Sequence, residues 1–376
     1  MERMGGVDEL KLRIAYIAYL GFPSNTAGSL NVVRACSAMG EMGHEVLLLV
    51  PSRHPLKLDT VTNCFSHYGV PPTFSVQPLP AWQGLGGRHY FSWRCLMKLH
   101  GFRPDLVICR YLRSARYTCL AGFNTVCELH SPIKKKRKQI EKLLSSAHMK
   151  LFVTVSHRLR HHYLAQNLPG LSPDRIVALP SGRAPLEQTP PPVPLSKTTP
   201  GWNIGYVGKL QHQKGMTVVR DLARRLPHHD FHIIGGDQES VSSWRSQMPG
   251  GNVHFHGYIP PAEVPSYIEA MDICLLPNQP HSANPSDTLY TSPMKAFDYM
   301  AQGKAIFASD YPEIREILSE DTSVLLPPQD TDAWVHAIES SRKEDLLSIG
   351  RTAKEFFMKN FTIQSKYRRI IEQSTR

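Results

Sequence analysis

Short apolar runs alternate with amphipathic stretches along most of this chain, and this alternation limits it to one class of fold. The first apolar run covers residues 13–18, and apolar residues at helical spacing follow in 29–42, with Ser29 as a candidate N-cap. Gly43 ends that stretch, and a second apolar run covers 45–50. A strand, a helix and another buried strand in this order are typical of a βαβ unit, so the sequence predicts an α/β fold with parallel sheets.

A proline-rich segment divides the chain into two parts. We expect an N-terminal Rossmann-like domain over 1–184, a linker over 185–201 and a second Rossmann-like domain over 202–376, because consecutive prolines cannot continue a helix or a central strand. The length of 376 residues is sufficient for two domains. The strand and helix alternation resumes after the linker, with apolar runs at 203–208, 231–236 and 273–277.

Apolar content and cysteine usage exclude several classes of protein. No window approaches ~18 consecutive apolar residues, so no membrane-spanning helix is predicted. The first twelve residues are polar and mixed in charge, which is not the pattern of a signal peptide. The seven cysteines include no CxxC pair and several lie inside apolar runs, which favours reduced, buried thiols in a cytoplasmic protein.

The net charge of +11 is concentrated in the first half of the chain. Residues 1–200 hold 25 lysines and arginines against 11 acidic residues, a balance of +14, whereas residues 201–376 have a balance of −3. This asymmetry indicates an anionic partner such as a membrane surface, a polyanionic acceptor or nucleic acid, although a solvated basic surface fits it equally. Five consecutive cations are candidates for contact with a membrane or an acceptor: Lys134, Lys135, Lys136, Arg137 and Lys138.

The segment 292–304 has the pattern of an anion-binding helix. Ser292 and Pro293 form a turn signal, a short helical stretch follows, and Gly303 ends it before the apolar run 305–308. A helix N-terminus offers backbone N–H groups and a positive dipole end to an anion. Asp298 lies about one and a half turns further along, where its carboxylate can accept hydrogen bonds from hydroxyls. A phosphate held beside a polyol is the chemistry of a sugar nucleotide.

A second candidate anion site lies earlier in the same half of the chain. Gly208, Lys209, Lys214 and Gly215 fall between an expected strand and an expected helix. Glycines allow the backbone to approach a diphosphate closely, and each lysine supplies a point charge with three donors. The motif is not a P-loop because the GK[ST] ending is missing, and the GxGxxG fingerprint of dinucleotide binding is also absent.

In its order of motifs the chain resembles the GT-B glycosyltransferases of the retaining group 1 kind, family GT4. The resemblance rests on segments spread over nearly the whole chain: 43–46, Glu128-Leu129-His130, Pro180-Ser181-Gly182, 205–209 with 214–215, 252–258, 292–300 and 308–310. It implies two Rossmann-like domains facing a cleft, with the last helix, about 362–375, returning to the N-terminal domain. The first domain would bind the acceptor and the second the nucleotide sugar.

The resemblance also implies roles for individual residues. Lys209 takes the place of the family's cation on the donor diphosphate, usually Arg, and Lys214 matches its partner lysine. Asp298 stands at the carboxylate that binds the nucleotide ribose, usually Glu. His130, which ends an expected central strand, matches the histidine that faces the donor sugar. We therefore expect His130, Lys209 and Lys214 to be catalytic, and we expect further donor contacts from Gly28, Gly208, Tyr258 and Met294.

The loop before the helix at 294 completes the expected donor site. By the same resemblance, Thr291, Ser292 and Pro293 form the loop whose backbone amides would meet the phosphates. Tyr290 occupies the position of the family's other acidic residue, which contacts the donor sugar in many members. Asp287 is close enough in the sequence to serve as a substitute sugar contact.

The implied reaction is retaining transfer of a sugar from a UDP- or GDP-sugar to a glycan or lipid-linked acceptor, with no metal or other cofactor. The lysine pair and the helix N-terminus would stabilise the departing diphosphate. The basic first half favours peripheral attachment to the inner face of the cytoplasmic membrane, with no nucleic-acid partner expected. Two alternatives stay open: a sugar-nucleotide epimerase of the same fold, and a catalytically degenerate basic binding protein, which the Tyr290 substitution allows.

Overall fold

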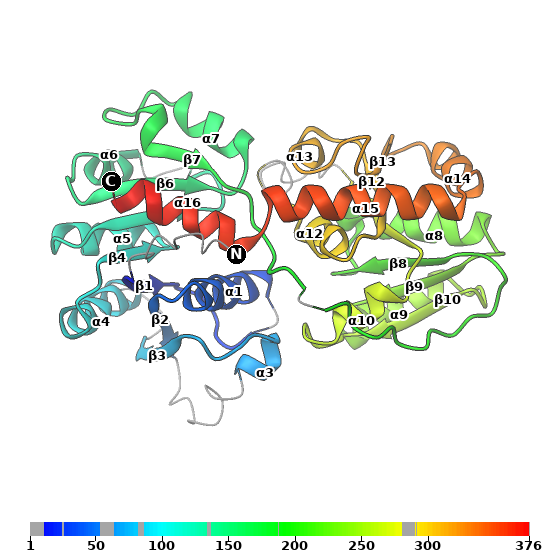
Figure 1. Cartoon of the computed structure of the whole chain (residues 1–376), viewed down its shortest axis with the longest axis horizontal. Helices are drawn as coiled ribbons and strands as arrows, with labels where there is room; N and C mark the ends of the chain where they lie inside the picture. The colour runs from blue at the N-terminus through cyan, green and yellow to red at the C-terminus, as the bar shows by residue number, and fades with distance from the viewer. Residues whose placement is uncertain are drawn as a thin grey trace, which may run out of the picture. The chain divides into compact units, whose positions relative to one another are not determined.

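The computed structural model describes residues 11–24, 26–52, 64–81, 86–133, 137–186, 188–279, 290 and 292–375, which form two compact units (Figure 1). Unit 1 contains the described residues up to Val155, Leu159–Leu179 and those from Lys366 onward. Unit 2 contains Ser156–Arg158 and Pro180–Ser365. The boundary therefore lies a few residues before the expected linker, and most of the last helix belongs to unit 1.

Unit 1 is built on a seven-stranded parallel sheet with the order β3-β2-β1-β4-β5-β6-β7. Its central strands are buried at almost every position because helices cover both faces, so they lack the alternation of a half-exposed strand. The strands are β1 (Arg13–Ile17), β2 (Glu45–Ser52), β3 (Ser75–Pro80), β4 (Leu106–Cys109), β5 (Thr125–Leu129), β6 (Met149–Thr154) and β7 (Ile176–Ala178).

The helices of unit 1 begin and end at recognisable signals. Helix α1 begins after Thr26, whose Oγ1 accepts a hydrogen bond from the Ser29 amide at 3.4 Å, so the expectation that Ser29 is the N-cap is wrong. Gly43 follows its end with a φ of 91°. The helices are α1 (Ala27–Glu41), α3 (Cys64–Tyr68), α4 (Gly87–Phe102), α5 (Leu112–Leu120), α6 (Arg137–Leu144), α7 (His157–Leu164), the 3₁₀ turn η1 (Pro173–Arg175) and α16 (Ile363–Thr375).

Unit 2 holds a six-stranded parallel sheet with the order β10-β9-β8-β11-β12-β13. Its strands are β8 (Asn203–Val207), β9 (Asp230–Ile234), β10 (Val253–Gly257), β11 (Ile273–Leu276), β12 (Ala305–Ser309) and β13 (Val324–Leu326). Its helices are η2 (His212–Lys214, a 3₁₀ turn), α8 (Met216–Arg225), α9 (Gln238–Gln247), α10 (Val264–Glu269), α12 (Met294–Ala301), α13 (Pro312–Arg315), α14 (Thr331–Glu339) and α15 (Lys343–Asn360). Two parallel α/β sheets confirm the predicted fold class.

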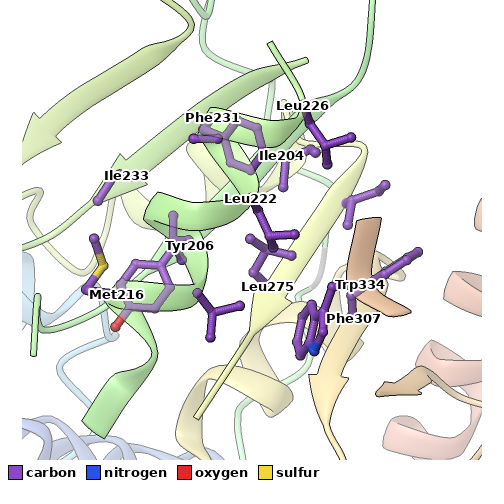
Figure 2. Close-up of a cluster of buried hydrophobic side chains, with 14 of the residues drawn as sticks. Ile204, Tyr206, Met216, Leu222, Leu226, Phe231, Ile233, Leu275, Phe307 and Trp334 are labelled. Atoms are coloured by element: carbon purple, nitrogen blue, oxygen red, sulfur yellow. The ribbon is translucent and has the colours of Figure 1, made fainter. Parts of the chain in front are cut away.

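The core of unit 2 consists of two apolar layers, one on each face of its sheet. Successive residues of a strand alternate between them: Phe307 packs in the layer drawn in Figure 2, while Ile306 and Ala308 pack in the other. Figure 2 shows Tyr206 of β8 among the side chains of the first layer, with Trp334 of α14 at the other end of the group. This packing holds the ends of β8 and β11 in place.

All seven cysteines are buried and none is in a disulfide, as expected for reduced thiols. Burial raises the pKa of the Cys36, Cys95, Cys109, Cys127 and Cys274 thiols, which keeps them protonated and unreactive at neutral pH. None of the helices in the described ranges combines the length and apolar character that a bilayer span needs.

Three histidines lie side by side on β9 and β10. His232 Nδ1 is 3.2 Å from His256 Nε2, and the His232 ring stacks on that of His254 with centroids 4.8 Å apart. His254 Nε2 lies 2.7 Å from the buried Asp230 Oδ1. Burial, together with the nearby charges of His254 and His256, lowers the pKa of His232 to about 4. The folded unit therefore keeps this imidazole neutral.

We expect this cluster to make unit 2 less stable in mild acid. A histidine in the unfolded chain has a pKa near 6.5. Between about pH 6.5 and 4 the unfolded chain therefore binds a proton at His232 that the folded protein does not bind. The free energy of unfolding consequently falls as the pH falls. The loss is on the order of 1–3 kcal/mol. Urea unfolding from pH 7.5 to pH 4.5 measures it. His232→Phe should flatten the pH dependence and exposed His161→Phe should not; equal slopes in all three proteins would contradict this origin.

Candidate active site

The candidate site of unit 2 lies at the carboxyl ends of β8 and β11. These strands are neighbours at the point where the strand order reverses, which is where open α/β sheets bind ligands. The turn η2 and helix α8 follow β8, and α12 follows β11 in the chain. Parallel strands present the two segments that the sequence selected, 208–215 and 292–298, at the same edge of the sheet.

Two glycines allow the chain to pass closely through this edge. Gly208 has a φ of 143°, and a Cβ there would lie 2.7 Å from the Cε of Lys295. Gly215 has a φ of 87°, and a Cβ there would overlap the carbonyl oxygen of Pro277, which follows β11. A side chain at either position would be strained and would collide with a neighbour, so both positions require glycine.

Three lysines belong to this edge. Lys209 is exposed, and its carbonyl oxygen accepts a hydrogen bond from the Tyr206 hydroxyl at 2.6 Å. Lys214 ends η2. Lys295, in the first turn of α12, has a buried Nζ that lies 3.7 Å from the centroid of the Tyr206 ring and has no hydrogen-bond partner among the described residues. Burial and the charge of Lys214 hold the pKa of Lys295 well below its usual value.

Lys295 is not among the residues predicted from the sequence. A lysine near the start of a helix is most often a solvated surface charge, and nothing local distinguishes this one. Its burial results from the approach of β8 and α12, which brings it against Gly208 and Tyr206. The sequence feature that points to a role for Lys295 is its position in the first turn of the helix predicted to bind an anion.

The start of α12 offers further polar groups. Pro293 is the N-cap residue and no side chain caps the helix. The hydroxyl oxygen of Ser292 is buried and has no hydrogen-bond partner among the described residues. A buried hydroxyl of this kind is costly unless a ligand or water satisfies it. Ser292 and Pro293, from which phosphate contacts are expected, and Met294, a further expected donor contact, lie at the start of α12, whereas Thr291 and Asp287 fall outside the described residues.

Asp298 pairs with Arg183, a residue that the sequence analysis did not select. Arg183 Nε lies 2.9 Å from Asp298 Oδ1, and both side chains are largely buried. Burial raises the pKa of Asp298, and the guanidinium partly offsets this. Arg183 Nη1 is buried without a hydrogen-bond partner in the described part of the chain. No local pattern connects two residues so distant in sequence, and we had placed Arg183 at the end of the first domain.

Two predicted donor residues lie outside this lysine group. Tyr258 follows the edge strand β10 and is 45% exposed, so its ring is available on the same edge of the sheet. Tyr290 is half-buried, and its carbonyl oxygen accepts a hydrogen bond from the Ser156 hydroxyl at 3.3 Å.

Unit 1 has a candidate site of its own at the ends of β4 and β5. Arg110 follows β4 and His130 follows β5, and Arg110 Nη2 lies 3.4 Å from His130 Nδ1. Arg110 Nη1 donates to the carbonyl oxygen of Gly28 at 3.4 Å. Gly28 is in the first turn of α1. Arg110 therefore connects two of the predicted residues, and the sequence analysis missed it.

A buried carboxylate, Glu128, supports His130. Its Oε1 accepts a hydrogen bond from the Tyr367 hydroxyl at 3.0 Å and lies 3.5 Å from Lys366 Nζ. Its Oε2 accepts a hydrogen bond from the Tyr16 hydroxyl and lies 3.8 Å from His130 Nε2. Burial acts to raise the pKa of Glu128, but Lys366, His130 and Arg110 hold it well below its usual value.

His130 is consequently neutral at physiological pH. Burial and the nearby Arg110 guanidinium lower the pKa of His130 to about 4, against the opposing effect of Glu128. A neutral imidazole can exchange hydrogen bonds with the hydroxyls of a sugar, and the groups around it fix its orientation.

The basic run of unit 1 is used partly within the fold. Arg137 pairs with Glu141 at 2.8 Å and donates to the carbonyl oxygen of Gln166 at 2.9 Å. Lys138 is exposed, and the first three lysines, Lys134, Lys135 and Lys136, lie outside the described residues.

Two protein-family models match the chain, one on each side of the expected linker. The family described as "Glycosyltransferase Family 4" matches residues 31–184, and that described as "Glycosyl transferases group 1" matches residues 201–342. Among curated proteins, the putative teichuronic acid biosynthesis glycosyltransferase TuaH of Bacillus subtilis (strain 168) is 26% identical over 110 residues, which are 29% of this chain. The matched part spans about a quarter of that relative's length, 27%.

Solved structures share the fold over almost the whole chain. A glycosyltransferase from Rickettsia africae has a TM-score of 0.72 at 13% identity, covering 97% of this chain and 98% of the other. Sucrose-phosphate synthase from Thermosynechococcus elongatus has a TM-score of 0.68 at 16% identity, covering 96% and 99%. Anabaena HepE in complex with UDP-glucose has a TM-score of 0.68 at 14% identity, covering 97% and 99%. At these identities the likeness establishes the GT-B fold.

Proposed function

Because the chain belongs to the group 1 glycosyltransferases of family 4, we propose that it transfers a sugar from a nucleotide-sugar donor to a glycan or lipid-linked acceptor. One observation carries the proposal: the buried Nζ of Lys295 lies beside Gly208 at the edge where β8 and β11 end. An unpaired buried ammonium is unfavourable unless an anion joins it. A diphosphate at this edge would also meet Lys214 and the start of α12.

In the proposed reaction, the acceptor hydroxyl attacks the anomeric carbon on the face from which the nucleotide departs. The bond between that carbon and the β-phosphate oxygen breaks, and the acceptor proton passes to the departing phosphate, so the anomeric configuration is retained. Lys209, Lys214 and Lys295 would stabilise the negative charge that develops on the diphosphate. Lysines in this role would make a metal ion unnecessary.

The other predicted residues have roles at the two ends of the donor. Asp298, held by Arg183, would accept hydrogen bonds from the ribose hydroxyls through its remaining lone pairs. His130, neutral and supported by Glu128, would contact the transferred sugar. UDP is our first choice of nucleotide because a protein of the same fold, HepE, is described in complex with UDP-glucose.

Nucleotide binding without metal is the direct test. We expect UDP in excess EDTA to raise the unfolding temperature of the full chain, since a ligand at ~100 times its dissociation constant adds ~2.7 kcal/mol to stability. GDP, ADP and the corresponding sugars, measured in the same panel, identify the base. A shift that appears only after Mg²⁺ is added would refute the metal-free diphosphate site.

The two alternatives give different results in the same preparation. A sugar-nucleotide epimerase would convert a UDP-sugar into its epimer without releasing UDP. A degenerate basic binding protein would give no shift with any nucleotide and would show binding to anionic polymers that weakens steeply with salt.

A further inference from the structure

Helices α4 and α5 of unit 1 form a strongly basic part of the chain. Residues 86–127 contain seven lysines and arginines but a single acidic residue, Asp105. The Asp105 carboxylate accepts a hydrogen bond from the backbone amide of Arg13 at 2.7 Å. The two helices pack against each other (Figure 1). His89 Nδ1 of α4 lies 3.0 Å from the Tyr117 hydroxyl of α5.

The outer face of these helices also exposes large apolar side chains. On α4, Phe91, Cys95 and Leu99 face the core, whereas Trp93 and Met97, one turn apart, are 47% and 57% exposed. On the neighbouring helix α5, Leu120 is 76% exposed. Exposed tryptophan, methionine and leucine side chains on neighbouring helices can bury apolar area against another surface.

Four cations accompany these apolar residues on the same two helices. Arg94 and Lys98 belong to α4, and Arg113 and Arg116 belong to α5. None of the four forms an ion pair with another residue in the described ranges. Burial lowers the pKa of His89, and the charges of Arg113 and Arg116 lower it further. The Ser92 and Ser114 hydroxyls, whose oxygens are 3.1 Å apart, mark the contact between the two helices.

We propose that this α4/α5 surface, composed of Trp93, Met97, Leu120, Arg94, Lys98, Arg113 and Arg116, binds the surface of an anionic membrane. Both the cations and the apolar side chains of this surface can interact with such a membrane. Phosphate headgroups attract the cations, while Trp93, Met97 and Leu120 bury apolar area at the boundary with the acyl chains. A polyanion in water would match the cations but offer nothing to the apolar side chains. The proposal extends the proposed function, since a lipid-linked acceptor is presented at such a surface.

A different exposed apolar face provides matched controls. Leu347, Phe356 and Met358 of α15 are 58%, 40% and 47% exposed, but that helix also carries Glu344, Asp345 and Glu355. The helix holds four lysines and arginines against these three acidic residues, so its attraction to an anionic bilayer is small and this face should not bind one.

Vesicle flotation with the full chain tests the proposal. We expect the wild type to bind vesicles of phosphatidylcholine mixed with phosphatidylglycerol and not vesicles of phosphatidylcholine alone. Arg113→Gln with Arg116→Gln should weaken binding about 25-fold, at about fivefold for each cation removed. Trp93→Ser with Met97→Ser should weaken it at least about tenfold. Control pairs on α15, Arg351→Gln with Lys359→Gln and Leu347→Ser with Met358→Ser, should bind like the wild type.

Other outcomes would overturn the proposal. It fails if the wild type does not float with anionic vesicles, or if the α4/α5 variants bind as well as the α15 controls. Binding to a single-stranded oligonucleotide or heparin, unchanged by Trp93→Ser with Met97→Ser, would identify a polyanion surface instead. The UDP-induced thermal shift, measured on the same variants, distinguishes a failure of the proposed function from a failure of the membrane proposal. If UDP gives no shift but the wild type still binds vesicles, only the proposed function is refuted.

Discussion

Lys214→Ala is expected to lower the rate of sugar transfer by about 10²–10³-fold, the usual loss when one preorganised electrostatic group is removed from an active site. Lys214 lies close enough to Lys295 for its charge to lower the pKa of Lys295. Its removal therefore relieves a repulsion between cations in the free protein, and we expect no loss of folding stability. Release of UDP from a UDP-sugar, with circular dichroism for the fold, measures both effects.

A matched lysine elsewhere controls for the general loss of positive charge. Lys197 is exposed in the chain segment that connects β7 to β8, and Lys197→Ala should leave turnover at the wild-type level. The proposed diphosphate site would be wrong if Lys214→Ala kept full turnover, or if both variants lost the same amount.

Glu128→Ala is expected to destabilise unit 1 by about 3–5 kcal/mol, because it leaves the buried Lys366 ammonium without its counter-charge. It also removes the acceptor of the Tyr16 and Tyr367 hydroxyls. The pKa of Glu128 is lower in the folded protein than in the unfolded chain, so its contribution is present above the unfolded value and lost as the pH falls through the folded value. Urea unfolding at pH 7 measures the effect.

A double-mutant cycle identifies the origin of this loss. Glu128→Gln with Lys366→Met removes both charges and keeps one amide oxygen as the acceptor for one of the two tyrosine hydroxyls, so it should cost less than the two single changes added together. The exposed pair Arg342–Asp345 at the start of α15 is the control, and Asp345→Ala should leave the unfolding midpoint close to that of the wild type. Strict additivity of Glu128→Gln and Lys366→Met would show that the two groups do not interact.

The parts of the structure that sequence reasoning predicted depend on local patterns. Apolar runs predicted strands such as β1, β2, β8, β9 and β11 but not β3, and Gly208 and Gly215 marked turns where a Cβ would meet a neighbour. The segment 292–304 was predicted as loop, helix and strand, and α12 and β12 lie there. Once a parallel sheet is predicted, the residues at the carboxyl ends of its strands are also predicted to lie at one edge of the sheet.

What sequence reasoning missed are contacts between distant residues. Arg183 and Asp298 meet across more than a hundred positions, and Lys366 reaches Glu128 from the last helix. Lys295 was overlooked because burial by tertiary packing, not local spacing, makes its ammonium unusual. Buried charged side chains of this kind can be identified only from the folded structure, because tertiary packing and not the local sequence buries them.

Calorimetric titration of UDP into the wild type and Lys295→Met tests the central claim most directly. The buried ammonium of Lys295 disfavours the free fold, so its replacement by an apolar side chain of similar length should raise the unfolding temperature of the ligand-free protein. The same change removes a charge-assisted contact with the diphosphate and should weaken UDP binding at least about tenfold. Higher stability with weaker binding is the predicted result; UDP binding of wild-type strength in Lys295→Met would contradict the site.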